Sequence, residues 1–285
     1  MAEIIPFQGI IYNTEQVSPS LTTAPPYDVV TPEAKEELYR KDSRNIIRVD
    51  FGKDLDSDTE QENRYTRAAA FISSWLQEGA LIKDREPYFY CYEIQYALEG
   101  VEKKTRGFFG AVKIEEIGSG RIHPHEMTYS KPKSDRLNIL RYCRANTSPI
   151  FSLYSSSDRT TSALLETIVR GKPLIEAKDG DGFTHRLWRI SSSHAIRTIS
   201  EEMADKDVFI ADGHHRYETA LAFKKEMEQD GHGGSGNEPF NYVLMFLSNM
   251  EDEGLTLLPT HRIVEVNSEI NIREVLTMHF SLKKA

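Results

Sequence analysis

The chain has 285 residues, of which 39% are hydrophobic and 28% charged, and its formal net charge at pH 7 is -9. This balance is typical of a soluble globular protein, and no segment approaches the roughly 18 consecutive apolar residues that a membrane span needs. The negative charge repels a polyphosphate backbone and disfavours broad nucleic-acid binding, whereas a small anionic ligand remains compatible with it.

The N-terminus and the cysteines indicate a cytoplasmic protein. The opening residues, MAEIIPFQGIIYN, lack the basic region, apolar core and cleavage site of a secretory signal. Cys91 and Cys143 belong to no metal-binding spacing, which fits a reducing compartment. We expect both cysteines to be packing residues.

The first third of the chain predicts two helices and a hairpin. An extended arm fixed by two prolines leads to Thr31-Pro32-Glu33, which is typical of a helix start. Apolar residues at helical spacing predict a second helix within residues 60 to 79. Aromatic and β-branched residues then predict two strands joined at Glu99-Gly100.

The remainder alternates between helices and strands. After an extended piece at His123-Pro124-His125 and a basic loop, we expect a helix over 134 to 145 and a strand over 150 to 154. Further strands are expected at 183–190, 208–211, 242–247 and 255–266, with helices ending near Gly171, around Ile196 to Met203, after residue 213, and at the C-terminus. This pattern predicts an α/β (mixed α+β) fold in which helices pack on mixed sheets.

The domain organisation has two interpretations. A change in the residue pattern near residue 118 suggests an N-terminal α+β unit (1–118) and a C-terminal α/β unit (119–285). A single continuous domain is the alternative, since no long linker marks the boundary. The chain stops at FSLKKA, where a further strand would be due, so a missing C-terminal part is expected.

The glycine-rich loop at Gly231 to Gly236 matches the dinucleotide-binding pattern GxGxxG only formally. A dinucleotide site needs this turn between a strand and a following helix, so that the helix N-terminus meets the pyrophosphate. Here the order is helix, loop, strand. We expect a surface loop.

The stretch VFIADGHHRYETA, residues 208 to 220, carries the most informative pattern. A strand that turns through Gly213 into a helix leaves backbone amides at the helix start, where the helix dipole also favours negative charge. Gly213 permits close approach of a ligand, and Arg216 can grip phosphate oxygens. His214 and His215 add hydrogen-bond donors whose charge depends on pH.

Asp212 fits such an anion site only with a further role. It would repel a phosphate unless it binds a metal ion, accepts a proton or orients an imidazole. The alternative is structural: Asp212 as a helix N-cap, Gly213 as a turn residue and the histidines as packed or solvated side chains.

A second motif, HPHEM, supplies His123, His125 and Glu126. The two histidines at i and i+2 share one face of an extended segment and could begin a metal site, or could be surface histidines around a proline. Glu126 could serve as general base or magnesium ligand beside an anion site formed by three cations, Lys131, Lys133 and Arg136. Alternatively, these basic residues could belong to a solvated loop. Two further segments could reach the site: Tyr27-Asp28 and Thr260-His261-Arg262.

ADGHHRYETA resembles the signature of the family called domain of unknown function 1015. Other matching pieces are PPYDV (25–29), NIIRVDFG (45–52), HPHEMT (123–128), SDRLNILR (134–141), SPIFSLY (148–154) and LPTHR (258–262). The resemblance covers most of the chain and implies little about function.

The corner is also similar to that of the ParB and sulfiredoxin superfamily, which reads GERR in ParB proteins, GCHRY in sulfiredoxins and DGHTR in relatives that include free-serine kinases. Gly213 and Arg216 match all three forms, whereas Asp212 and His214 match the kinase form. His214 replaces the sulfiredoxin cysteine, which disfavours a thiol-based reductase. The similarity implies a ParB/sulfiredoxin-like C-terminal part that binds a nucleotide and transfers a phosphoryl group.

Three functional hypotheses follow. The first is a phosphotransferase that uses ATP or ADP with magnesium and a small hydroxyl-bearing acceptor, with Asp212, His214 and Glu126 as catalytic residues. Its cofactor-binding residues would be Gly213, His215, Arg216, Lys131, Lys133 and Arg136, and its metal ligands would come from Asp212, Glu126, His123 and His125. The second is a metal-dependent hydrolase that uses the histidine clusters, and the third is a non-catalytic regulator that responds to nucleotides.

Overall fold

The computed structural model describes residues 2–126, 130–258 and 271–283, and within the helix that opens the second range it describes side chains from residue 133 onward. The chain divides into two compact units, Met1–Leu255 and Thr256–Ala285. Each is treated by itself.

The N-terminal region consists mainly of short helices with well-defined starts. Thr31 caps α2 by accepting a hydrogen bond from the Ala34 amide, and Asn63 and Thr66 form a reciprocal capping box at the start of α4. Both predicted helices are therefore confirmed. The elements of this region are α1 (Pro19–Thr22), the 3-10 helix η1 (Tyr27–Val29), α2 (Pro32–Lys41), α3 (Ile47–Asp50) and α4 (Arg64–Gln77).

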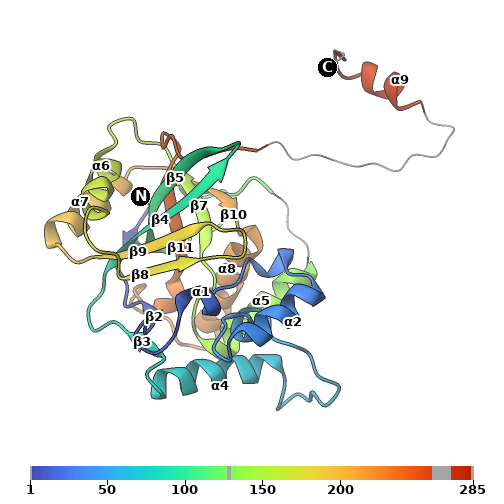
Figure 1. Cartoon of the computed structure of the whole chain (residues 1–285), viewed down its shortest axis with the longest axis vertical. Coiled ribbons are helices and arrows are strands. Elements are labelled where there is room, and N and C mark those ends of the chain that lie inside the picture. The colour runs from blue at the N-terminus through green and yellow to red at the C-terminus, as the bar shows by residue number, and fades with distance from the viewer. Residues whose placement is uncertain (1, 127–129, 259–270, 284–285) are drawn as a thin grey trace. The chain divides into compact units, whose positions relative to one another are not determined.

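A mixed sheet of nine strands forms the centre of the first unit (Figure 1). Its order is β6-β10-β7-β11-β5-β4-β9-β8, and β1 pairs with β5 as an additional neighbour. The pairs β6–β10 and β7–β11 are parallel and the others are antiparallel. The strands are β1 (Ile4–Ile5), β4 (Phe89–Leu98), β5 (Val101–Lys113), β6 (Ile122–His123), β7 (Ile150–Tyr154), β8 (Ile175–Lys178), β9 (Thr184–Ile190), β10 (Val208–Asp212) and β11 (Tyr242–Asn249). A separate pair joins β2 (Ile10–Tyr12) to β3 (Leu81–Lys83).

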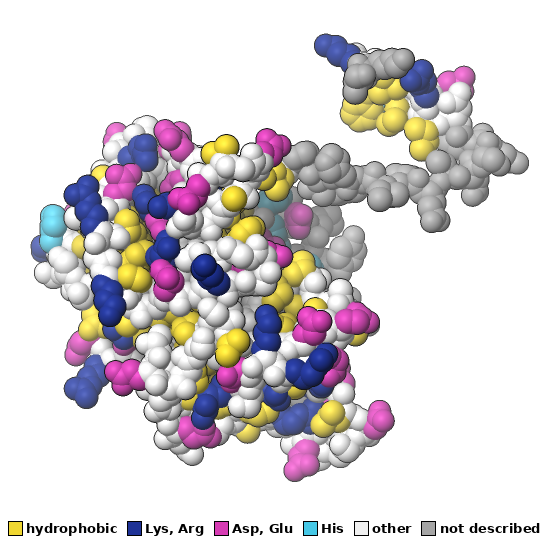
Figure 2. Space-filling view, in the orientation of Figure 1, with side chains coloured by type: hydrophobic (Ala, Val, Ile, Leu, Met, Phe, Trp, Pro, Cys, Tyr) yellow, Lys and Arg dark blue, Asp and Glu magenta, His cyan; other side chains and the backbone are white. Residues whose placement is uncertain are grey.

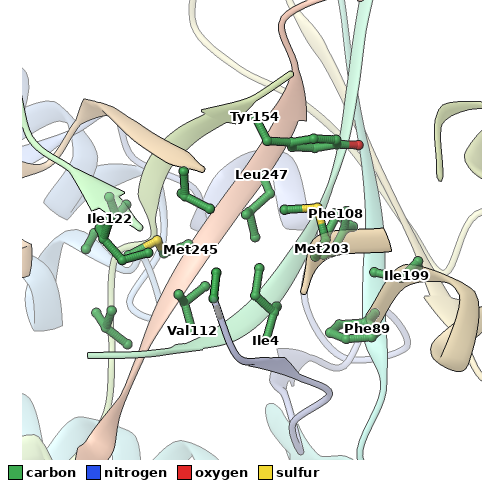
Figure 3. Close-up of a cluster of buried hydrophobic side chains, with 14 of the residues drawn as sticks. Ile4, Phe89, Phe108, Val112, Ile122, Tyr154, Ile199, Met203, Met245 and Leu247 are labelled. Carbon is green, nitrogen blue, oxygen red and sulfur yellow. The ribbon is translucent and has the colours of Figure 1, made fainter. Parts of the chain in front are cut away.

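Helices on two sides of the sheet complete the core. In Figure 1, α6 (Thr160–Ile168) and α7 (Ser193–Met203) lie to the left of the sheet, and α5 (Ser130–Cys143) lies to its lower right. The helix α8 (His214–Gln229) packs against α5, β7 and β11. Figure 3 shows the core side chains that these elements share, among them Phe108 from β5, Met203 from α7 and Leu247 from β11. The mixed α/β fold class is confirmed.

The sheet also bears on the boundary predicted near residue 118. β5 ends before that residue and pairs over seven positions with β11, which follows it by more than a hundred residues. A division at residue 118 would separate these hydrogen-bonded neighbours.

Several local predictions can be checked directly. Glu99 and Gly100 adopt positive φ angles of 51° and 80° and join β4 to β5, as the hairpin pattern predicts. The glycine-rich loop follows α8 and is exposed. The strand predicted over 255–266 is wrong at residues 255–258, which are irregular, and its other residues lie outside the described part. In the second unit, the last helix is α9 (Ile272–Thr277). None of the described helices combines the length and apolar composition needed to cross a membrane.

Candidate functional site

The predicted strand-to-helix corner is present. β10 pairs with β6 on one side and β7 on the other, and its register shifts between Ile210 and Asp212, which re-aims the end of the strand. Gly213 has a φ of 97° and is the N-cap of α8. This left-handed conformation favours glycine, and it lets the chain turn directly from the sheet into the helix.

A small open cavity of about 100 Å³ lies at this corner. Three distant segments line it: the N-terminal arm, the segment that follows β6, and the start of α8. The lining residues are Tyr27, Asp28, Glu126, Asp212, Gly213, His214, His215 and Arg216. The structure therefore brings together most of the corner residues with Glu126, as the phosphotransferase hypothesis requires, and adds Tyr27 and Asp28.

Arg216 is engaged within the protein but still borders the cavity. Its guanidinium donates to the Pro149 carbonyl and to the Asp212 carboxylate, and its side chain is 14% exposed. Asp212 is 55% exposed. In this ion pair the charges of Asp212 and Arg216 compensate each other.

His214 is buried and lies between two residues of the HPHEM motif. The backbone amide of His125 donates to His214 Nε2 over 3.2 Å, so the proton of a neutral His214 ring is on Nδ1. Nδ1 lies 3.7 Å from Glu126 Oε2. Burial, followed by the nearby His125, lowers the pKa of His214 below its ordinary value. His214 is thus a neutral ring that faces the Glu126 carboxylate.

The two histidines of HPHEM have different surroundings. His125 packs edge-to-face on His214 with ring centroids 4.5 Å apart, and its Nδ1–H donates to the Ile210 carbonyl over 2.8 Å. His123 instead lies 3.2 Å from the Asp207 carboxylate, and its ring contacts that of Phe209 in a tilted arrangement. His123 is therefore not brought to the cavity. Among the described residues, no group of three or more His, Cys, Asp or Glu side chains is arranged to hold a metal ion.

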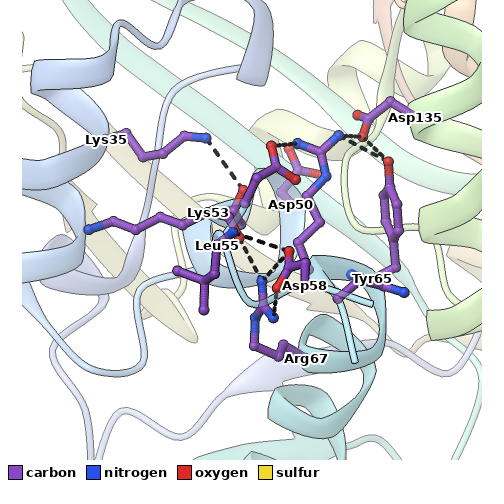
Figure 4. A network of polar contacts seen from close by, with 12 residues as sticks. Lys35, Asp50, Lys53, Leu55, Asp58, Tyr65, Arg67 and Asp135 are labelled. Atoms are coloured by element: carbon purple, nitrogen blue, oxygen red, sulfur yellow. Dashed lines mark hydrogen bonds and ion pairs between the residues drawn. The ribbon is translucent and has the colours of Figure 1, made fainter. Parts of the chain in front are cut away.

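Two of the three predicted phosphate-binding cations form ion pairs with protein carboxylates outside the cavity. Lys133 forms an ion pair with Glu218. Arg136 is buried, with its side chain 5% exposed, and donates to the carboxylates of Asp50 and Asp135. Figure 4 shows part of this network, in which Asp135 accepts from the Tyr65 hydroxyl. The side chain of Lys131 lies outside the described part.

Arg136 has a structural role that the sequence did not indicate. Its guanidinium also lies 4.1 Å from the ring centroid of Tyr27, which lines the cavity. In this geometry the Arg136 guanidinium donates to Asp50 and Asp135 and does not line the cavity at the corner, so the structure does not support its predicted role as a phosphate ligand. Tyr27 and Asp28, which follow the Pro25-Pro26 arm and were named as able to reach the site, line the cavity. Thr260-His261-Arg262 lies outside the described residues.

The visible surface does not present a basic patch. Figure 2 shows Lys and Arg side chains intermixed with Asp and Glu over this face of the molecule. At the cavity itself, three carboxylates and one guanidinium are present. The cavity is acidic overall, which suits an anion that arrives with a divalent cation better than a bare anion.

The lowered pKa of His214 predicts an acid-sensitive contribution to stability. Because the unfolded chain binds this proton more readily, stability is retained above about pH 6.5 and decreases as the pH falls below it. We expect the melting temperature of the wild type to fall more between about pH 7.5 and about pH 5.5 than that of His214→Gln. Replacement of the exposed His232 by glutamine is the control and should keep the wild-type pH dependence, since an exposed imidazole is not desolvated on folding. Equal slopes for wild type and His214→Gln would contradict the assignment.

The chain was compared with known protein families, curated proteins and solved structures. The family model described as "Protein of unknown function (DUF1015)" matches residues 4–284. No curated protein and no solved structure matches the chain.

Proposed function

Since the chain belongs to the DUF1015 family, whose description assigns no activity, we propose a function from the site itself: a magnesium-dependent phosphotransferase that binds ATP or ADP at the start of α8. The observation that carries the proposal is the cavity in which a glycine-initiated helix N-terminus, Arg216 and carboxylates from three segments converge. Helix N-termini bind phosphate through their amides and dipole.

The anion would bind by an exchange of partners at the corner. In the free protein, Asp212 and Arg216 neutralise each other. A phosphate group approaching Gly213 competes for the Arg216 guanidinium, which prefers bidentate phosphate contacts. The released Asp212 carboxylate then faces the cavity beside Glu126.

Asp212 is the residue that would hold Mg²⁺, since Glu126 is assigned as the base. In proteins this ion commonly uses one or two carboxylates and completes its shell with water and substrate phosphates, so it does not need a preformed cluster of protein ligands. When bound, it would neutralise charge on the transferring phosphoryl group.

Glu126 is the proposed general base. Its side chain is 66% exposed, and the Nδ1 side of neutral His214 faces it at 3.7 Å. The acceptor hydroxyl oxygen forms a bond to the terminal phosphorus of ATP or ADP, the bond from that phosphorus to the bridging oxygen breaks, and the hydroxyl proton passes to Glu126. ADP or AMP leaves with the electron pair of the broken bond. His214 is a positioning residue for the base.

The alternatives are weaker on this geometry. A hydrolase that uses His123, His125, His214 and His215 as metal ligands requires them to converge, and His123 is paired with Asp207 away from the cavity. A regulator would use the same cavity without turnover, so measurements of binding and of reaction distinguish it.

Thermal unfolding with nucleotides tests the proposal. We expect Mg²⁺-ATP or Mg²⁺-ADP to raise the melting temperature, since a ligand at 100 times its Kd adds about 2.7 kcal/mol of stability. Arg216→Ala should abolish this shift, whereas Arg141→Ala, which removes an exposed arginine paired with Glu226, should preserve it. Phosphorus NMR with a panel of small hydroxyl compounds then detects transfer. The absence of stabilisation by any nucleotide would reject the proposal, and binding without transfer would favour the regulator.

A further inference from the structure

The cavity at the start of α8 is small compared with a nucleotide. It encloses about 100 Å³. This is the space of roughly three water molecules, at a liquid volume of about 30 Å³ each. Cavities that bury a whole drug-sized ligand enclose about 300–1,000 Å³. The cavity therefore suits a single phosphoryl group and not the nucleoside attached to it.

The lining is polar as well as small. None of the described residues that line the cavity is aliphatic, and Tyr27 supplies the largest apolar surface. The Arg136 guanidinium lies 4.1 Å from the centroid of the Tyr27 ring, and the ring of Phe51 lies 6.2 Å from it. These neighbours occupy part of the ring surface on which a base could stack. The lining thus offers charge and hydrogen bonds rather than the apolar surface that a nucleobase requires.

A buried hydrogen-bond donor indicates an oxygen-rich ligand in this space. His214 lines the cavity, and its side chain is only 4% exposed. Its Nε2 accepts from the His125 amide, so Nδ1 carries the proton of the neutral ring. Among the described residues this Nδ1–H has no acceptor, because Glu126 Oε2, at 3.7 Å, is beyond hydrogen-bonding distance. A buried donor without an acceptor is destabilising, and a phosphoryl oxygen in the cavity would supply one.

We propose that the site selects its phosphoryl donor by the end of the phosphate chain and not by the nucleoside. The inference rests on the proposed function and adds to it the class of donor: nucleoside diphosphates and triphosphates of any base, and inorganic tripolyphosphate. The terminal phosphoryl group occupies the cavity beside Arg216 and the Nδ1–H of His214. The remainder of the donor extends into solvent.

The transfer step is the same for each donor. The acceptor oxygen forms a bond to the terminal phosphorus, the bond from that phosphorus to the bridging oxygen breaks, and the hydroxyl proton passes to Glu126. With tripolyphosphate as donor, pyrophosphate leaves with the electron pair of the broken bond. With ATP as donor, ADP leaves in the same way.

Calorimetric titration of the full chain tests the inference with four ligands that share the triphosphate. These are Mg²⁺-ATP, Mg²⁺-GTP, Mg²⁺-CTP and Mg²⁺-tripolyphosphate. We expect their four Kd values to agree within about tenfold, because the cavity contacts only the part that they have in common.

Tyr27→Leu tests the ring on which a base could stack. The variant should change the affinities for Mg²⁺-ATP and for Mg²⁺-tripolyphosphate by the same factor, within about twofold. Tyr142→Leu is the matched control, because Tyr142 is 43% exposed, stacks on Tyr65 and does not line the cavity. It should bind both ligands as the wild type does.

The outcomes separate the two proposals. If the wild type binds none of the four ligands, the proposed function fails and this inference fails with it. If Mg²⁺-ATP binds more than about tenfold more tightly than tripolyphosphate or than the other nucleotides, only the donor class is rejected. A loss of affinity for Mg²⁺-ATP in Tyr27→Leu that spares tripolyphosphate would also reject it, because the base would then contact that ring.

Discussion

Replacement of Arg136 by alanine is expected to lower the free energy of unfolding by about 3–5 kcal/mol, because it leaves buried carboxylate charge without its partner. The Arg136 and Asp50 side chains are only 5% and 8% exposed, and Asp135 is 16% exposed. Arg136 also donates to the backbone carbonyl of Asp50 over 2.6 Å, so the change removes a contact to the backbone of α3 as well. Urea-induced unfolding followed by circular dichroism measures the effect.

Arg141→Ala is the matched control for this prediction. Arg141 is on the same helix, α5, and is paired with Glu226, but the two side chains are 45% and 34% exposed. Exposed pairs contribute little, so a loss below about 1 kcal/mol is expected. Should Arg136→Ala destabilise the protein no more than Arg141→Ala, the network would not have the structural role assigned to it.

Gly213→Ala is expected to destabilise the protein by about 1–3 kcal/mol and to abolish stabilisation by Mg²⁺-ATP. The φ of 97° is unfavourable for any residue with a side chain. A Cβ at this position would also lie 2.9 Å from Arg216 Nε. The guanidinium would have to move, and the added methyl group would block the close approach of a ligand to the backbone.

Gly182→Ala separates these two effects. Gly182 has a similar φ of 83°, and a Cβ there would meet no described atom within 4 Å. It should lower stability through backbone strain alone and leave nucleotide binding unchanged. The proposed site would be contradicted if Gly213→Ala still bound Mg²⁺-ATP with the wild-type affinity.

The sequence predicted those features that depend on local contacts. The start of α2 follows from Thr31, whose hydroxyl accepts from the amide three residues later. The turn at Glu99-Gly100 and the corner at Gly213 likewise depend on the conformations of one or two residues. Such features are encoded by neighbouring residues, so pattern and propensity are sufficient to find them.

Features that depend on distant partners were not predicted. Arg136 belongs to a basic run that looked suitable for a phosphate, but its partner Asp50 is 86 residues away in the chain. Lys133 pairs with Glu218 on another helix, and His123 with Asp207, which immediately precedes β10. No alternation or spacing within these segments indicates such pairings. For the same reason, the insertion of β1 beside β5 could not be inferred.

The assembly of the cavity from residues 27–28, 126 and 212–216 has a consequence for biosynthesis. During translation, residues 27–28 leave the ribosome long before residues 212–216. The cavity is therefore incomplete until the segment that contains α8 has emerged. Contacts between such remote segments form slowly, because each must close a long loop of chain. Nucleotide affinity should therefore appear late when the protein refolds from denaturant, after the sheet has acquired its secondary structure.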